Sequence, residues 1–454
     1  CDFERGSLVV VVSAPLVVSA PLVVSASLVV SAPSSYRRRI PFKNPSSRRM
    51  IEDRMRNQES VSFRSVLLQP DMIRVFVASL FVLGQVLVSF SLVPLYIAER
   101  GGDTFAIGLQ TTVFAVASVV LRFIFGPMAD TRGRRLVLAV GAFVFATANL
   151  AIYYSPSLAW MIAARVYQAV GMASYLSSAS SLVADLAPDE HRGSAIGAYR
   201  MILPFASLVG PFLGNGVINR WGFETFFFAM AASAFFSFFV VLTLRAGRRP
   251  LRGTVEPITM RDFVSIFRNG EVRSAYLAVL ALSVGGGIIN TYIATYGNPY
   301  FTNPATYFVV YAFFGASAAL GVGRLSDRIG RRRLVWPVLA AMGLGHLVLR
   351  GIDYAPAVVF YTSAVLTGIG FNAGLSVLIS WIVDGITPSL RATALSLQES
   401  WIDGGFALGI FAFGTLSASY GEATVFVWTG IAVAASAPLV MRGARRADRT
   451  RRTV

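Results

Sequence analysis

Gly126-Pro-Met-Ala-Asp-Thr-Arg-Gly-Arg-Arg135 is a basic turn between two apolar runs that are each long enough to cross a lipid bilayer. Gly323-Arg-Leu-Ser-Asp-Arg-Ile-Gly-Arg-Arg-Arg333 repeats its spacing, with an Asp, a Gly three residues later and an Arg directly after that Gly. The two acids, Asp130 and Asp327, are 197 positions apart (327 − 130), nearly half of the chain. Two copies of one charged turn, each set between hydrophobic segments, predict a duplicated membrane bundle.

The composition supports a membrane protein and argues against several other classes. Of the 454 residues, 55% are hydrophobic, which exceeds what a soluble core of this size needs. The net charge of +17 comes from arginines in short turns, so we interpret it as a topology signal and expect no nucleic-acid partner. Lys43 is the only lysine and Cys1 the only cysteine, beside two histidines. We therefore expect no ATP-binding loop, enzymatic function, metal site or cofactor.

Twelve apolar runs have the length of helices that cross a hydrocarbon core ~30 Å thick. They fall at 73–97, 105–126, 136–154, 158–184, 193–218, 224–244, 274–297, 304–323, 334–350, 356–384, 392–417 and 424–441. The sequence thus predicts an all-α membrane protein with twelve transmembrane helices in two pseudo-symmetric six-helix bundles.

The segments around the spans complete the predicted organisation. The expected parts are a low-complexity and basic segment that is disordered or precedes the true start (1–49), a cytoplasmic N-terminal segment (50–72), the N-terminal bundle (73–244), a cytoplasmic linker (245–273), the C-terminal bundle (274–441) and a basic cytoplasmic tail (442–454). Placing both repeated turns, the linker and the tails on one side leaves only Arg100, Arg220 and Arg350 near the other. This bias predicts a plasma-membrane protein with both termini in the cytoplasm.

The repeated turn resembles the Gly-x-x-x-Asp-x-x-Gly-Arg-Arg motif of the major facilitator superfamily, which lies between spans two and three and again between eight and nine. Arg165-Val-Tyr-Gln168-Ala-Val-Gly171 resembles the Arg-x-x-Gln-Gly-x-Gly stretch of the drug and sugar efflux, proton antiporter branch, with Ala169 where Gly is usual. The stretch from Ala206 to Asn215 resembles the antiporter signature Gly-x-x-x-Gly-Pro-x-x-Gly-Gly and departs from it at those two ends.

Within this signature, Gly210 and Gly214 allow close helix approach, and Pro211 frees backbone groups and bends a helix. We therefore expect these three residues to act in helix bending.

The resemblance implies a cytoplasmic latch in which the turn Asp and Arg join an acid at the foot of the fourth span. The predicted gating residues of this kind are Asp130, Arg134 and Asp185, with Asp327, Arg331 and Asp384 as their mirror images. Each exposed pair contributes only ~1 kcal/mol, which suits a gate that must open. The alternative is an arginine cluster that sets topology alone.

Charges inside the spans that differ between the halves are the candidates for coupling. Glu399 occupies the position equivalent to Arg200, and Asp403 lies one helical turn beyond Glu399. A charge at membrane depth costs at least ~2.5 kcal/mol, so it is retained for pairing or for a task. A carboxylate whose cationic partner comes and goes with conformation binds and releases a proton. The proton-coupling candidates are therefore Glu399, Asp403, Arg165 and Arg200.

Arg122 is a further gating candidate, because spans two and eleven are neighbours in the family that the chain resembles. We predict that Arg122 pairs with Glu399 or Asp403 and closes the cytoplasmic side. The alternative is a static structural ion pair.

In the resembling fold, spans one, four, seven and ten line the substrate cavity. The corresponding candidates are Gln85, Arg165, Gln168, Asn290, Tyr292, Tyr296 and Asn372. No acid is among them, so Arg165 favours an anion or a polar neutral substrate over a cation. Each tyrosine has packing as its alternative role.

Together these features predict a secondary active transporter that moves a small organic solute by alternating access, most simply by proton-coupled efflux. Its expected partners are the substrate, protons and the lipid bilayer, and we expect a monomer. Two alternatives stay open: an uptake symporter or facilitator for an organic anion, and a non-transporting receptor or interaction subunit on the same scaffold.

Overall fold

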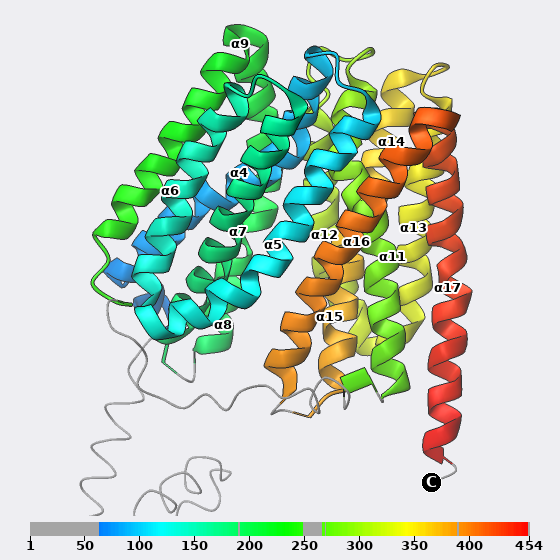
Figure 1. The fold of residues 1–454 in the computed structure, drawn as a ribbon. Coiled ribbons are helices and arrows are strands. Elements are labelled where there is room, and N and C mark those ends of the chain that lie inside the picture. Colours follow the sequence, from blue (N-terminus) through cyan, green and yellow to red (C-terminus); the bar gives the residue numbers. More distant parts are fainter. Residues whose placement is uncertain (1–62, 189–190, 248–265, 268, 388–389, 453–454) are drawn as a thin grey trace, which may run out of the picture. The chain divides into compact units, whose positions relative to one another are not determined.

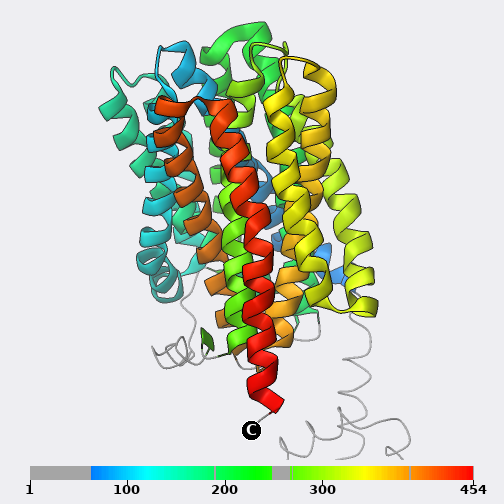
Figure 2. The ribbon, with the colours of Figure 1, turned by 90° about the vertical axis from the view of Figure 1, so that its right-hand side faces the viewer.

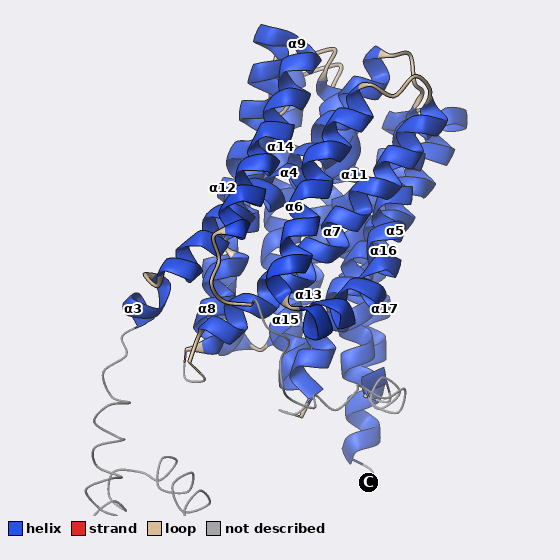
Figure 3. Ribbon diagram, turned by 60° about the vertical axis from the view of Figure 1, so that its left-hand side comes forward, coloured by secondary structure: helices blue, strands red, loops and turns tan. Residues whose placement is uncertain are grey.

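The apolar segments form long helices that run side by side, as the computed structural model shows (Figure 1). It describes residues 63–188, 191–247, 266–267, 269–387 and 390–452, and it leaves out the side chains of 130, 177, 193, 324, 327, 391–393, 396 and 444–452. These residues form helices, turns and loops, and none of them lies in a strand (Figure 3). A short helix, α3 (Phe63–Leu67), precedes the long ones.

The first half of the bundle, called the N-half here, comprises α4 (Pro70–Glu99), α5 (Thr104–Arg132), α6 (Arg134–Tyr153), α7 (Leu158–Leu186), α8 (Arg192–Arg200) and α9 (Ile202–Leu242). The C-half comprises α11 (Gly270–Gly297), α12 (Thr306–Ile329), α13 (Arg331–Val348), the 3₁₀ turn η1 (Leu349–Gly351), α14 (Pro356–Gly368), the π turn η2 (Ile369–Ala373), α15 (Gly374–Asp384), α16 (Arg391–Tyr420) and α17 (Glu422–Arg452). All of them after α3 belong to one compact unit, Val66–Val454.

Twelve crossings follow from the lengths of these helices. Ten helical stretches of the described chain are long and apolar enough to span a membrane. One of them, Ser194–Leu242, has 49 residues and breaks at Gly222, where φ is 79°. Its 49 residues would extend ~73 Å as one helix, so they make two crossings of a ~30 Å core. Leu158–Leu186, with 29 residues, adds a further crossing. The predicted twelve helices in two sixes are confirmed.

The two repeated turns have the same backbone conformation. Gly133 (φ 95°) joins α5 to α6, and Gly330 (φ 92°) joins α12 to α13. Residues with a side chain rarely adopt these angles, which explains why both copies of the motif carry a glycine there. We call the end of the bundle that carries these two turns the basic end.

Most contacts between the two halves of the described chain are made by α5 with α16, α9 with α12, and α4 with α11. Figure 1 shows the N-half helices on the left and the C-half helices on the right, and Figure 2 shows α17 alongside α11 and α13. The neighbouring second and eleventh spans that the sequence predicts are thus α5 and α16.

Several predicted segments differ or are not described. The tenth crossing, expected as one continuous helix, contains the π turn η2 between α14 and α15. The helix α17 continues to Arg452 through most of the expected basic tail. The expected segment 1–49, most of 50–72 and residues 248–265 of the linker lie outside the described residues.

Candidate functional site

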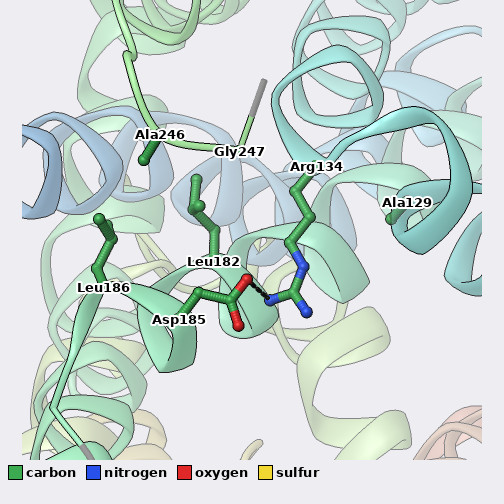
Figure 4. A pocket seen from close by; sticks show the side chains of 7 residues that line it. All are labelled: Ala129, Arg134, Leu182, Asp185, Leu186, Ala246 and Gly247. Carbon is green, nitrogen blue, oxygen red and sulfur yellow. Dashed lines mark ion pairs between the residues drawn. The ribbon is translucent and has the colours of Figure 1, made fainter. Parts of the chain in front are cut away.

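An ion pair joins two helices of the N-half at the basic end. Arg134, the first residue of α6, places its Nη1 atom 2.6 Å from Oδ2 of Asp185 near the end of α7. The pair borders a cavity of about 200 Å³, which is otherwise lined by Ala129, Leu182, Leu186, Ala246 and Gly247 (Figure 4). The first residues of the linker therefore lie against the predicted latch.

The C-half carries the mirrored pair. Nε of Arg331 lies 3.1 Å from Oδ2 of Asp384, and Nη1 of Arg331 donates to Oγ of Ser326 at 2.5 Å. The side chains of Asp130 and Asp327, also predicted to belong to the latches, lie outside the description. Two of the predicted contacts are thus present, one in each half, and their gating role stays a prediction.

Two further ion pairs cross from one half to the other. Nη1 of Arg122 on α5 lies 2.5 Å from Oδ2 of Asp403 on α16, with side chains 18% and 24% exposed. Nη2 of Arg200 on α8 lies 3.2 Å from Oε1 of Glu399, with side chains 43% and 41% exposed. The first pair has the contact that the sequence predicts. The second shows that the pseudo-equivalent positions of the two halves also meet in space.

A chain of neutral amides runs through the interior of the N-half. Gln168 donates to Oδ1 of Asn149 at 3.4 Å, and Asn149 donates to Oε1 of Gln85 at 2.8 Å. Gln85 in turn donates to the Met230 carbonyl at 2.9 Å and to Oγ of Ser233 at 2.7 Å. The chain links α7, α6, α4 and α9. Gln85 and Gln168, predicted to line a cavity, are held in this packing.

Arg165 stands at the head of the amide chain and is fully buried, with 0% of its surface exposed. Its Nη1 atom donates to Oγ of Ser89 and to Oε1 of Gln168, both at 2.5 Å. Its guanidinium lies 4.5 Å from the centre of the Phe114 ring, while its Nε and Nη2 atoms have no hydrogen-bond partner. Within the described chain, Arg165 forms no ion pair with a carboxylate.

The predicted cavity residues of the C-half divide into two groups. Tyr292 donates to the Ile410 carbonyl on α16 at 2.9 Å, and Tyr296 donates to the Leu349 carbonyl at 3.2 Å, so both tyrosines serve packing. Asn290 and Asn372 each donate to a carbonyl of their own crossing, and the hydroxyl of Tyr311 lies beside both amides. The structure thus brings Asn290 and Asn372 together beside Tyr311, whereas Tyr292 and Tyr296 bond to backbone carbonyls elsewhere.

At the end opposite the basic end, neutral amides join the halves. Nδ2 of Asn215 on α9 donates to Oδ1 of Asn303 at 2.9 Å, and Nδ2 of Asn219 donates to the Thr302 carbonyl at 2.6 Å. Asn215 is one of the two residues that depart from the antiporter signature, and here it bridges the halves.

The small residues of the same signature lie against α4. A side chain at Gly210 would meet Val88, and one at Gly214 would meet Leu92. Within α9, the residue with non-helical backbone angles is Gly222 rather than Pro211. Close approach of the helices is therefore observed, while bending at Pro211 stays a prediction.

The sequence analysis missed Asn149, Tyr311 and Phe114. A single amide or ring within an apolar run gives no charge signal, and only the fold brings these residues to the site. Among the described residues, no cluster of three His, Cys, Asp or Glu side chains could hold a metal ion.

Comparison with known proteins gives consistent matches. The family model of the Major Facilitator Superfamily matches residues 74–321 and 301–453. Multidrug resistance protein MdtG of Klebsiella pneumoniae is 23% identical over 360 residues, which cover 75% of this chain and 86% of MdtG. The staphylopine export protein of Staphylococcus aureus is 23% identical over 351 residues, which cover 75% of this chain and 88% of that protein. The crystal structure of the nucleoside transporter NupG has a TM-score of 0.70 at 15% identity and covers 83% of this chain and 99% of its own; this likeness shows the fold alone.

Proposed function

The chain belongs to the major facilitator superfamily and is a multi-pass secondary transporter, and on this premise we propose that it exports a small organic solute in exchange for protons. The observation that carries this proposal is the pair of acids on α16. Glu399 and Asp403 each face an arginine of the other half, at 3.2 Å and 2.5 Å.

Movement of the halves changes the charge balance at these acids. While the halves are together at the basic end, Arg122 and Arg200 compensate the two carboxylates, and a proton that enters from the opposite end neutralises an acid and frees its arginine. When the halves then separate near the basic end, water reaches the acids, favours their charged form and lets the proton leave on that side. The proton thus moves toward the basic end while the substrate moves away from it. Proton binding is then linked to the position of the halves, as exchange by alternating access requires.

In this proposal the latches within each half stabilise the closed basic end and break when that end opens. Arg134–Asp185 and Arg331–Asp384 connect neighbouring helices of one half, and each partly exposed pair contributes only ~1 kcal/mol. We place the basic end, and with it both termini, in the cytoplasm, and the protein in the plasma membrane as a monomer. The arginines at the opposite end, Arg100, Arg220 and Arg350, are few by comparison.

The names of two relatives support export as the direction. MdtG is a multidrug resistance protein and the second relative is an export protein. At 23% identity the substrate of neither is transferred to this chain.

Flux in proteoliposomes with a trapped pH-sensitive dye tests the proposal. A pH gradient is imposed, and fluorescent organic anions, cations and sugars are screened on the unmodified protein, Glu399→Gln and Asp403→Asn. We expect substrate-dependent proton movement that falls at least ~10-fold in one of these variants, since removing a coupling acid removes the step itself. Asp353→Asn, which removes an acid that bonds to Tyr300 outside the cross-half pairs, serves as the control and keeps full flux.

Unchanged coupling in both acid variants would contradict the proposal. Substrate binding without any flux would instead favour a receptor on the same scaffold.

One observation favours a second candidate, a symporter or facilitator that takes up an organic anion. Arg165 is buried and pairs with no carboxylate of the described chain, so an anion fits it better than a cation does. The direction of the flux under the imposed gradient separates this candidate from export.

A further inference from the structure

Four phenylalanine rings connect Arg165 to the C-half across the middle of the bundle. The Phe114 ring lies over the guanidinium at 4.5 Å and meets Phe90 at 5.6 Å between ring centres. Phe90 of α4 meets Phe406 of α16 at 6.2 Å, and Phe406 meets Phe371 of η2 at 5.9 Å. We call these four residues the phenylalanine bridge. Its Phe90–Phe406 contact joins the two halves.

On the C-half side, the last two rings of the bridge pack on glycines. A side chain at Gly286 would enter the Phe371 ring, and one at Gly287 would meet the backbone and ring of Phe406. Asn372 follows Phe371 in the same π turn, and Asn290 lies one helical turn beyond Gly286 on α11. The far end of the bridge therefore adjoins two neutral amides.

The charge of Arg165 is incompletely matched at the near end of the bridge. The groups that Nη1 contacts, Ser89 and Gln168, are neutral, and the amide chain behind Gln168 contains no acid. Nε and Nη2 are buried and without a hydrogen-bond partner. These two atoms form the edge of a guanidinium that binds a carboxylate through two parallel hydrogen bonds. An anion with a planar head would satisfy both atoms and match the charge.

Rocking of the halves gives a ligand access to this arrangement. Phe90 and Phe114 belong to the N-half, whereas Phe371 and Phe406 belong to the C-half. Separation at the Phe90–Phe406 contact leaves two aromatic faces beside Arg165 that a flat apolar body can cover. Stacking between rings is favourable in such offset and edge-on arrangements.

We propose that the substrate binds at the phenylalanine bridge and is a flat organic anion, with its carboxylate or sulfonate on Nε and Nη2 of Arg165 and its apolar body between Phe90 and Phe406. The proposal rests on the transport function proposed above and names its substrate class. It holds for either direction of transport.

Equilibrium binding to the purified full-length protein in detergent tests the substrate class. The probes are 2-naphthoate and 2-naphthalenesulfonate, their neutral analogue 2-naphthamide, and the cation 2-naphthylmethylammonium, measured by calorimetry and by the shift of the melting temperature. We expect the two anions to bind at least ~10-fold more tightly than the amide and the cation, as two charge-assisted hydrogen bonds require. If the unmodified protein binds the amide as tightly as the two anions, or prefers the cation, the proposal is overturned.

Variants assign the anion to Arg165. Arg165→Gln is expected to lose the preference for anions, and Arg165→Lys to retain only part of it, because an ammonium lacks the planar fork. Phe406→Leu weakens all four probes equally, since it removes the aromatic face and no charge. Arg220→Gln is the matched control; this arginine lies 5.2 Å from the Trp221 ring at the opposite end, and its loss leaves binding unchanged.

The melting temperature distinguishes binding from a structural role. Removal of an uncompensated buried charge leaves the free protein equally or more stable, so Arg165→Gln without ligand should melt no lower than the unmodified protein. A large drop in melting temperature together with an unchanged anion preference would show that Arg165 is structural and overturn the proposal.

Failure of this inference and failure of the proposed transport function give different results. Proton-coupled flux of a cation or a sugar, with no preference for anions, would contradict the proposed substrate class and leave the proposed transport function standing. Anion binding at Arg165 without proton-coupled flux would contradict the proton coupling and leave the proposed substrate class standing.

Discussion

At the scale of single residues, Asn149 holds the amide chain behind Arg165 together. It accepts from Gln168 and donates to Gln85, so its removal leaves both partners without one hydrogen bond inside the N-half. All three side chains are buried, and no solvent is at hand to replace the lost bonds. The hydrogen bonds of the amide chain therefore depend on Asn149, although its side chain carries no charge.

We predict that Asn149→Leu lowers the free energy of unfolding by ~2 kcal/mol, since each buried polar group left unsatisfied costs ~1–3 kcal/mol. Denaturant unfolding in detergent measures this change. Asn298→Leu, at an exposed position, is the control and should stay within ~0.5 kcal/mol of the unmodified protein. Equal effects of the two substitutions would mean that the amide chain does not stabilise the fold.

Charged residues of the site were predictable, while neutral ones were not. Arg122 and Asp403 are rare charges in apolar runs, and the neighbouring spans of the resembling fold place them together. The contact between Arg200 and Glu399 did not follow from the sequence, because pseudo-symmetry gives equivalent positions and not proximity. Nothing in the sequence marks Asn149 and Phe114 as residues of the site, since amides and aromatic rings are common in membrane helices.

At the scale of elements, α5 and α16 approach each other closely at Gly108 and Gly414. A side chain at Gly414 would lie 3.3 Å from Cα of Gly108, 3.0 Å from the Thr104 carbonyl oxygen and 2.7 Å from the Tyr292 hydroxyl. Gly404 lies on the same helix α16 with nothing within 4 Å of its would-be side chain. The two positions differ in packing and share a helical backbone.

The two glycines of α16 should therefore respond with opposite signs to alanine. Gly414→Ala forces the helices apart and is expected to lower stability by ~1–3 kcal/mol, as overpacking does. Gly404→Ala gains helix propensity and should raise stability by up to ~1 kcal/mol. Denaturant unfolding of both variants checks the prediction, and a loss of stability at both positions would count against a close crossing at Gly414.

The regular helices followed from apolar run length, but the interruptions within them did not. The break at Gly222 sits between two predicted spans and agrees with them. The π turn at Ile369–Ala373 lies inside an apolar run with no proline, so the sequence predicts a plain helix there. Neighbouring helices pack closely around it, with Met342 against Gly370 and Tyr311 against Gly368.

At the scale of the whole bundle, the halves are joined by different chemistry at each end. Ion pairs link them toward the basic end, while hydrogen bonds link them at the other: Asn215–Asn303, Asn219–Thr302, and Thr104 with the Glu422 carboxylate. Loss of the ion pairs should weaken one set of contacts and leave the second intact. If the halves rock as bodies, such a change opens the basic end and closes the opposite one.

Distances between spin labels at both ends test alternating access most directly. Cys1 is the only cysteine in the chain, so its replacement by Ser leaves a clean background for labelling. One label pair, Thr131→Cys with Ile329→Cys, reports on the basic end. The second pair, Tyr154→Cys with Tyr354→Cys, reports on the opposite end, and all four positions are exposed.

Pulsed electron paramagnetic resonance in lipid nanodiscs then compares the unmodified charges with Arg122→Gln/Arg200→Gln. We predict that loss of both cross-half pairs lengthens the distances of the first label pair and shortens those of the second. Distances that stay unchanged at both ends, or that change in the same direction, would contradict rocking of the two halves about a central site.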